Sequence, residues 1–397
     1  MDAMGMNRSR MGLLSAMILL SCCLPAAGQA NSEAGDPKRD TSRLGTPDLR
    51  LRLAWQIALD RAGFSPGIID GKVGPKAATA VRMFQASRGL IANGAFDEPT
   101  AQALGVDPGL AIGTYTIAEA DPAQIGPVPT DWNEKARLPR LPYPSLEELV
   151  AEKFHCSRAL LAALNPGRSL AALKPGEGLR VPAAQEGPIA QGVRIEINLT
   201  DKQVHVIGSD GRPVGLFHCS VAKDKDKLPQ GSASVAVIVE NPSYRFDPAK
   251  WPEVRNVHEK LLIPPGPRNP VGLCWIGLSL PGYGMHGTPT PEMIGKTGSH
   301  GCFRLANWDA VRLGKMVRPG TPVIFSTQTA STQLPPANPA GAAAVAAAAG
   351  AAATPGAGAP PSPGTPGVPA NPGDPSAHAA PARPAWVTLR ATSPDFD

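Results

Sequence analysis

The chain has 397 residues, of which 42% are hydrophobic, and it contains 45 prolines and 42 glycines. This length predicts two to four domains with ordinary cores, and the excess of proline and glycine is expected in linkers or tails. The net charge is +5 without a dense block of lysine or arginine, which argues against a nucleic-acid-binding protein. This net charge is compatible with a weak attraction to an anionic polymer. It is equally compatible with no charge-based role at all.

The N-terminal 30 residues have the pattern of an export signal. Arg8 and Arg10 give it a positive start, residues 11–20 are apolar but too short to span a bilayer, and small residues follow at 25–30. We therefore expect residues 1–30 to be a signal peptide and the protein to be exported to the periplasm or cell envelope.

The cysteines leave two questions open. They stand at positions 22, 23, 156, 219, 274 and 302. The run from Leu19 to Cys22 resembles a bacterial lipobox, so a lipid anchor on Cys22 in the outer membrane is an alternative to simple cleavage. In an oxidising compartment Cys219 and Cys274 have the option of pairing, and two buried free thiols are the other interpretation.

Residues 46–106 predict a small three-helix domain. Thr46 is a typical N-cap, Pro47 a typical first helical residue, and Gly63 ends the apolar helical pattern. Pro75 opens a second helix, and a third, shorter helix follows. The domain resembles the peptidoglycan-binding-like domain that accompanies many bacterial wall enzymes. The matching residues are Gly63-Phe64, Pro66-Gly67, Ile69-Asp70-Gly71, Gly74, Ala80-Val81, Phe84-Gln85, Gly89-Leu90 and Thr100.

This resemblance implies that the domain binds the cell wall. We expect the wall-facing surface around the Asp70-Gly71 loop. A spacer that binds nothing is the alternative, because many of the matching residues are ordinary core or turn positions.

Residues 112–183 predict a second small module. A strand at 115–117 comes first, a capping box at 145–148 and a cap at Ser157 each begin a helix, and a strand at 179–182 ends the module. This order resembles a degenerate LysM module, a glycan-binding fold. The chain departs from that pattern by a long insertion after the first strand and by the absence of the usual Gly-Asp opening. Glycan binding and mere packing against the following domain are the two readings.

Residues 191–328 are rich in short strands with glycine and proline turns. Apolar residues alternate from Val193 to Ile207 around a turn at Asp201-Lys202, and a hairpin turn follows at 209–212. Many short strands in succession favour an antiparallel β sandwich or barrel.

Two short runs in this domain carry the residues best suited to chemistry. Met285 to Thr288 contains His286, and Ser299 to Leu305 contains Cys302. A cysteine attacks carbonyls as a thiolate, and an imidazole can take its proton, so these two are candidates for nucleophile and base. Gly301 lets backbone N–H groups converge as an oxyanion hole. The planar guanidinium group of Arg304 is suited to binding a carboxylate of the substrate.

Other readings stand beside this one. A lone cysteine is more often a small core residue. His286, His300, Cys302 and Cys274 also form a conceivable metal-ligand set.

The wider pattern resembles the L,D-transpeptidase (YkuD-type) catalytic domain. The runs that carry the resemblance are Ile263-Pro264-Pro265-Gly266-Pro267-Arg268-Asn269-Pro270-Val271-Gly272, His286-Gly287-Thr288 and Ser299-His300-Gly301-Cys302-Phe303-Arg304-Leu305. It implies a mainly-β YkuD sandwich that needs neither a metal nor an organic cofactor. The whole chain is then a multidomain α+β protein, in which residues 329–397, rich in alanine, proline and glycine, form a disordered tail.

The resemblance also implies a mechanism and its residues. Cys302 is the nucleophile, His286 the proton donor and acceptor, and the Gly287 carbonyl orients the imidazole. Backbone groups around His300 and Gly301 hold the oxyanion. Substrate binding falls to the last two site residues, which are Ser299 and Arg304.

The implied function is the cross-linking of peptidoglycan in cell wall biogenesis and the maintenance of cell shape. The enzyme attacks the third residue of a stem peptide, releases the terminal D-alanine, and passes the thioester to a second stem. The partners are peptidoglycan stem peptides and glycan, and nucleic acid is not among them. An L,D-carboxypeptidase or endopeptidase with the same Cys–His site, or a non-enzymatic wall-binding protein, are the alternatives.

Overall fold

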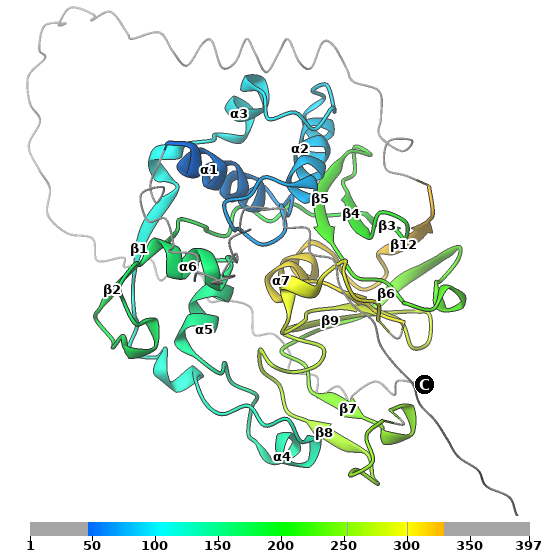
Figure 1. Cartoon of the computed structure of the whole chain (residues 1–397). Coiled ribbons are helices and arrows are strands. Elements are labelled where there is room, and N and C mark those ends of the chain that lie inside the picture. The colour runs from blue at the N-terminus through cyan, green and yellow to red at the C-terminus, as the bar shows by residue number, and fades with distance from the viewer. Residues whose placement is uncertain (1–46, 252, 300, 329–397) are drawn as a thin grey trace, which may run out of the picture. The chain divides into compact units, whose positions relative to one another are not determined.

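The computed structural model describes residues 47–251, 253–299 and 301–328. These residues belong to one compact unit (Figure 1). The predicted signal peptide, the lipidation site at Cys22, the predicted tail and His300 lie outside the described residues. Within the described part, no helix is both long and apolar enough to cross a membrane.

The first three helices form as the sequence predicts. They are α1 (Pro47–Arg61), α2 (Pro75–Arg88) and α3 (Glu98–Leu104). Gly89 ends α2 in the left-handed conformation (φ 69°), where a residue without a Cβ carries no steric penalty. Their shared core is built from large apolar side chains, among them Trp55, Leu59, Phe64, Val81 and Phe84.

The next part is a βααβ module, formed by β1 (Ile112–Thr116), α5 (Leu146–Lys153), α6 (Arg158–Leu164) and β2 (Gly178–Pro182). The strands pair antiparallel, and Ser145 and Ser157 cap the two helices as predicted. The long insertion after β1 contains a further helix, α4 (Trp132–Arg137), which the sequence pattern did not indicate.

A mixed eight-stranded sheet forms the third part, with the order β11-β10-β9-β6-β12-β3-β4-β5. Its strands are β3 (Arg194–Asn198), β4 (Gln203–Ile207), β5 (Pro213–His218), β6 (Ser232–Glu240), β9 (Cys274–Leu278), β10 (Gly284–His286), β11 (Phe303–Arg304) and β12 (Pro322–Ser326). The mainly-β prediction is confirmed. The sheet is not purely antiparallel, because β12 runs parallel to β3 and β11 runs parallel to β10.

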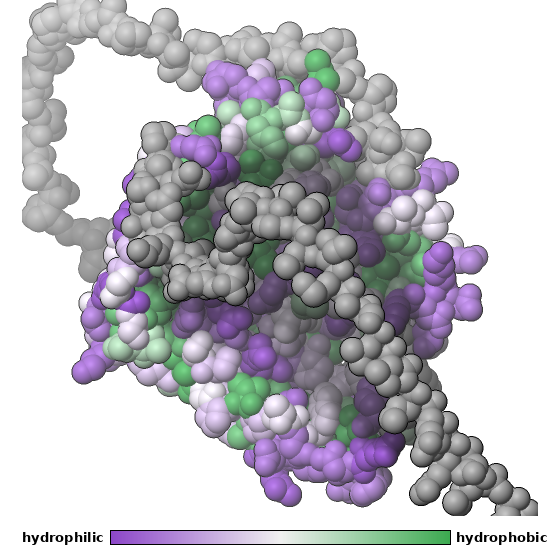
Figure 2. Space-filling view, viewed as in Figure 1, coloured by the Kyte–Doolittle hydropathy of each residue, from purple (hydrophilic) through white to green (hydrophobic). Residues whose placement is uncertain are grey.

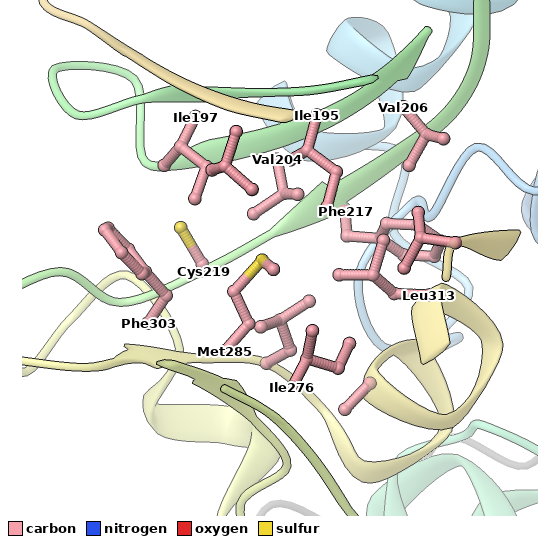
Figure 3. Close-up of a cluster of buried hydrophobic side chains, with 14 of the residues drawn as sticks. Ile195, Ile197, Val204, Val206, Phe217, Cys219, Ile276, Met285, Phe303 and Leu313 are labelled. Carbon is pink, nitrogen blue, oxygen red and sulfur yellow. The ribbon is translucent and has the colours of Figure 1, made fainter. Parts of the chain in front are cut away.

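The core of this domain lies between the two halves of the curled sheet. Figure 3 shows Ile195, Val204 and Phe217 from one half facing Ile276 and Met285 from the other. Helix α7 (Asn307–Met316) packs on β9 and contributes Leu313 to the same core. The curl thereby produces the sandwich-like core that the alternating strands predict.

The remaining elements are short. The strands β7 (Tyr244–Phe246) and β8 (Leu261–Ile263) form a separate two-stranded hairpin between β6 and β9. The 3-10 helices are Pro108–Leu110, Pro122–Gln124, Leu170–Ala172, Lys225–Lys227, Pro248–Lys250 and Pro291–Met293.

The turn after α1 covers the free edge of β5. Phe64 forms a parallel bridge with Leu216, and the Ser65 N–H donates to the Leu216 carbonyl at 2.8 Å. An uncovered edge strand is a template for aggregation, so this contact protects the sheet.

The loop expected to face the wall is partly occupied by the βααβ module. The Ile69 N–H donates to the His155 carbonyl at 2.9 Å, and Ile69 is fully buried. Lys72 and Val73 are the part of this loop that is exposed. A ligand of this domain therefore has access to the tip of the loop and not to its base.

Candidate active site

The segment with His286 and the segment with Cys302 meet because β10 and β11 are neighbours in the sheet. Their parallel register places Met285 opposite Phe303 and His286 opposite Arg304. Cys302 immediately precedes β11, so it lies beside Gly284 at the start of β10, and His286 stands at the other end of this three-residue strand. Cys302 and His286 line one cavity. The sequence prediction that these two runs form a single site is consistent with this arrangement.

His286 is held in one tautomer. Its Nδ1 lies 2.7 Å from the Gly287 carbonyl oxygen. A carbonyl oxygen accepts hydrogen bonds and never donates, so Nδ1 carries the proton and Nε2 is left with a free lone pair. The ring also stacks on Trp275, with centroids 5.7 Å apart. Burial lowers the pKa of His286 to about 4, which keeps the imidazole neutral and basic at pH 7.

Gly287 is required by close packing and not by backbone conformation. A Cβ at this position would lie 2.2 Å from Asn307 Oδ1 and 3.2 Å from the Leu273 nitrogen. Asn307 is fully buried and cannot easily move, because its Oδ1 accepts from the Leu273 N–H and its Nδ2 donates to Glu152. The fixed asparagine thereby sets the position of the carbonyl that orients His286.

Cys302 is partly buried, and its thiol lies 3.6 Å from the Gly282 carbonyl oxygen. Burial raises the pKa of Cys302 to about 11, although a backbone hydrogen bond at Gly284 and the charge of Arg304 favour the thiolate. A preformed thiolate is therefore disfavoured in the resting site. Cys302 and His286 face the cavity as a neutral thiol and a neutral imidazole.

Ser299 and Arg304 shape the turn that presents Cys302. The Ser299 hydroxyl donates to the Cys302 carbonyl at 2.5 Å and accepts from the Gly301 N–H at 3.3 Å. The Arg304 guanidinium donates to the carbonyls of Thr297 and Gly298. Both side chains also line the cavity, so they are placed to meet a ligand as well as to hold the loop.

The cavity has a volume of about 560 Å³ and a basic lining. Four cationic side chains contribute to it, namely Lys227, Arg245, Lys250 and Arg304. Its one carboxylate, Asp247, pairs with Lys260 at 3.1 Å. A cavity of this size and charge suits an extended ligand that carries carboxylates.

The β7–β8 hairpin supplies residues that sequence reasoning missed. Tyr244 and Trp251 line the cavity together with Arg245, Asp247 and Lys250. Burial raises the pKa of Tyr244, and the neighbouring Cys302 adds to this effect. Neither Tyr244 nor Trp251 belongs to the runs that marked the site, because the place of each depends on the fold of the hairpin.

The metal-site reading finds no support in the part of the chain that the structure describes. No group of three or more His, Cys, Asp or Glu side chains there is arranged to hold an ion. Cys274 is fully buried, and its sulfur lies 2.9 Å from the place of a Cβ on Gly314 in α7. Cys219 is also buried, and both thiols are free.

His205, His218 and His258 lie apart from this site. His205 Nε2 bonds to Gln203 at 2.9 Å, and burial lowers its pKa to about 4. Burial likewise lowers the pKa of His218, to about 3. His258 is exposed. None of the three lines the cavity.

Comparison with known proteins assigns the family. The L,D-transpeptidase catalytic domain family, YkuD, matches residues 192–325, and a peptidoglycan-binding domain family matches residues 52–104. The Bacillus subtilis (strain 168) protein YqjB, which carries the name of an L,D-transpeptidase, is 31% identical over 151 residues. That match covers 37% of this chain and 78% of YqjB. The chain belongs to the YkuD family of L,D-transpeptidases.

A second named relative has a similar identity, and solved structures match the chain more distantly. A Bacillus licheniformis protein named as an L,D-transpeptidase is 29% identical over 44% of this chain and 90% of its own length. The crystal structure of an L,D-transpeptidase from Xylanimonas cellulosilytica is 17% identical, with a TM-score of 0.28, and the match covers 69% of this chain and 92% of that one. Two other solved structures are matched over 53% and 60% of their length.

Proposed function

We propose that this YkuD family member is a peptidoglycan L,D-transpeptidase that forms cross-links through a thioester on Cys302. The observation that carries the proposal is the joint presence, in one basic cavity, of a thiol and a neutral imidazole whose Nε2 is free to accept a proton. A stem peptide carries carboxylates, and the cavity offers them four cationic side chains.

The acylation step follows from the protonation states of the pair. The Cys302 proton passes to His286 Nε2 as Sγ attacks the carbonyl of the third stem residue. Backbone N–H groups at His300, Gly301 and Cys302 hold the oxyanion. The carbon–nitrogen bond to the terminal D-alanine then breaks, and His286 returns the proton to the leaving amine. The Gly287 carbonyl keeps the imidazolium oriented throughout.

The second step transfers the acyl group. An amine of another stem attacks the thioester and His286 takes its proton. The carbon–sulfur bond then breaks, Cys302 leaves as a thiolate, and His286 returns the proton to it. If water attacks in place of the amine, the same residues give an L,D-carboxypeptidase or an endopeptidase. The acceptor is therefore what the assay has to identify.

The other predicted features form part of this proposal. Residues 1–30 export the protein to the periplasm or envelope, either as a cleaved form or as a lipoprotein anchored at Cys22. Residues 46–106 and the LysM-like module at 112–183 bring the catalytic domain at 191–328 to the wall, and cross-linking contributes to cell shape. The order of β1, α5, α6 and β2 supports the LysM-like reading of the module.

The test uses the mature chain with a disaccharide-tetrapeptide, and products are identified by mass spectrometry. We expect a cross-linked dimer that has lost one D-alanine. A tripeptide monomer alone assigns the hydrolase. Cys302→Ala is expected to reduce either product by at least about 10⁴-fold without loss of fold. An active alanine variant would overturn the mechanism, and an inert wild type with a normal fold would favour the non-enzymatic wall-binding protein.

A further inference from the structure

The insertion after β1 packs on the active-site hairpin. The clamp segment, residues 131–141, contains α4 and joins β7 and β8 in an apolar cluster of their own (Figure 1). The fully or nearly buried members of that cluster are Leu141, Phe246, Val257 and Ile263. The insertion that departs from the LysM pattern thus has a defined partner, and that partner is a wall of the active-site cavity.

Trp132 is the central contact between the two. Its ring stacks on Phe246, with centroids 4.1 Å apart and an interplanar angle of 17°. Tyr244 and Trp251 each lie 6.4 Å from it in tilted arrangements. The Lys135 ammonium lies 4.5 Å from the Trp132 ring centroid. One side chain of the clamp segment therefore packs beside two of the aromatic residues that line the cavity, Tyr244 and Trp251.

Hydrogen bonds fix the same contact at its ends. The Leu141 N–H donates to the Pro265 carbonyl at 2.8 Å. Asn133 donates to the Asn256 carbonyl at 3.2 Å, and the Asn256 side chain donates in turn to Asp131. Hydrogen bonds therefore hold the clamp segment near both of its ends, and the aromatic contact of Trp132 lies between them.

The backbones also approach closely at Gly266, which follows β8. Gly266 has a φ of 135°, and a Cβ there would lie 2.1 Å from the Leu141 carbonyl oxygen. The position therefore needs glycine for its conformation and for its space.

The hairpin depends on such support. The strands β7 and β8 have three residues each and pair with each other in a separate two-stranded sheet. A two-stranded hairpin is marginally stable by itself. Figure 2 shows mostly hydrophilic side chains along the lower edge of the visible face, where α4 and the hairpin lie. Phe246 and Ile263 of the hairpin are fully buried in the apolar cluster that they share with Leu141, so the clamp segment covers an apolar side of the hairpin.

We infer that the clamp segment holds the β7–β8 hairpin in the position that forms the cavity wall, with Trp132 as a positioning residue for Tyr244 and Trp251. The inference deepens the proposed function, on which it rests for the identity of the ligand. It gives the βααβ module a role in the active site that is independent of any glycan binding by that module.

Hydrogen exchange tests the clamp without reference to activity. In the mature chain, Trp132→Ala is expected to speed amide exchange at residues 244–246 and 261–263 by about 10-fold or more, while β6 and β9 keep their rates. The matched control is Phe154→Ala, which removes an aromatic of the same module that packs on Tyr115, away from the hairpin. Unchanged exchange in a folded Trp132→Ala variant would overturn the inference.

A milder variant keeps the test decisive if Trp132→Ala does not fold. Asn256→Ala removes one exposed side chain and its bond to Asp131. We expect it to speed exchange in the hairpin by about 2- to 5-fold, with no change in α5 or α6. A rate equal to that of the wild type would again count against the clamp.

Steady-state kinetics then distinguish an effect of Trp132 on substrate binding from an effect on the chemical step. For the tetrapeptide, Trp132→Ala is expected to raise KM by about 10-fold and to change kcat by less than about 3-fold, with Trp132→Phe close to the wild type. A KM that stays unchanged while the hairpin loosens would refute the role in binding. An inactive wild type would refute the proposed function and leave the exchange result to decide the clamp.

Discussion

The protonation state of Cys302 is the most consequential property at the scale of single residues. Burial raises the pKa of its thiol and lowers the pKa of His286, so both groups are neutral between these values. In the proposed mechanism, the free lone pair on Nε2 makes His286 a base that acts during attack. Activation in this mechanism comes from the orientation of the imidazole by the Gly287 carbonyl, and not from a stored thiolate–imidazolium pair.

Alkylation of the thiol as a function of pH tests this state. Because the pKa of Cys302 is raised, its thiolate fraction is small at pH 7 and grows as the pH increases. The rate of iodoacetamide modification of Cys302 is therefore expected to rise by about 10-fold per pH unit from pH 6 to 9, without a plateau. A plateau reached below pH 7 would show a preformed thiolate. The His286→Ala variant, which lacks the imidazole, serves as the reference curve.

Gly287 provides a second prediction at this scale. A methyl group at Gly287 would collide with Asn307 Oδ1, which two hydrogen bonds hold in place. In Gly287→Ala we expect the carbonyl to shift, the hydrogen bond from His286 Nδ1 to be lost, and kcat/KM to fall by about 100-fold.

Nuclear magnetic resonance detects the same hydrogen bond through the signal of the His286 Nδ1 proton, which the bond protects from exchange. This signal is expected to disappear in Gly287→Ala. Gly74→Ala is the control, because a Cβ there meets nothing within 4 Å. Wild-type turnover by Gly287→Ala would show that the carbonyl does not orient the base.

At the scale of elements, local signals determine what the sequence can predict. Proline at the start of α1 and α2, glycine after each of them, and serine caps on α5 and α6 all act within a few residues. The turn at Asp201-Lys202 likewise ends β3 and begins β4. These boundaries were predictable because capping and turn chemistry are local.

Elements whose position depends on distant contacts were not predictable. The parallel pairing of β3 with β12 joins the two ends of the domain, and no local pattern encodes it. The strands β10 and β11 are too short to show a period, although their motifs marked the site. Helix α4 has six residues and is stabilised by the β7–β8 hairpin. The role of Trp132 therefore became visible from packing alone.

For the molecule as a whole, the parts of the chain meet in a buried charged cluster. Asp309 of α7 accepts a hydrogen bond from Ser65 at 3.0 Å, and His155 of the βααβ module pairs with Asp60 of α1 at 2.9 Å. Burial and the nearby Asp60 raise the pKa of Asp309 to about 7, although Ser65, His155 and Lys76 favour its charge. Burial opposes the charge of His155, but the Asp60 carboxylate outweighs it and raises the pKa of this residue.

Both shifts make the stability of the folded chain fall as the pH rises. A group whose pKa is raised on folding stabilises the protein below its unfolded pKa and loses that contribution as the pH rises through the folded value. For Asp309 the loss spans about pH 4 to 7, at no more than about 1.4 kcal/mol per pH unit for the one proton. For His155 it begins near 6.5 and continues above it. The lowered pKa values of His205, His218 and His286 act in the opposite direction below pH 6.5, so the contribution of this cluster is measured as a difference between the wild type and a variant.

The Asp309→Asn variant isolates the carboxylate. Asparagine retains an oxygen that accepts from Ser65, but it does not titrate, so the change in melting temperature from pH 5 to pH 8 is expected to be more favourable than in the wild type by several degrees. Calorimetry across this range measures it, and Asp226→Asn, an exposed carboxyl away from the cluster, is the control. An unchanged pH dependence in Asp309→Asn would mean that Asp309 is ionised throughout. The buried charged cluster would then be a set of fixed ion pairs. The pH would not govern how firmly the three-helix domain and the βααβ module hold the catalytic domain.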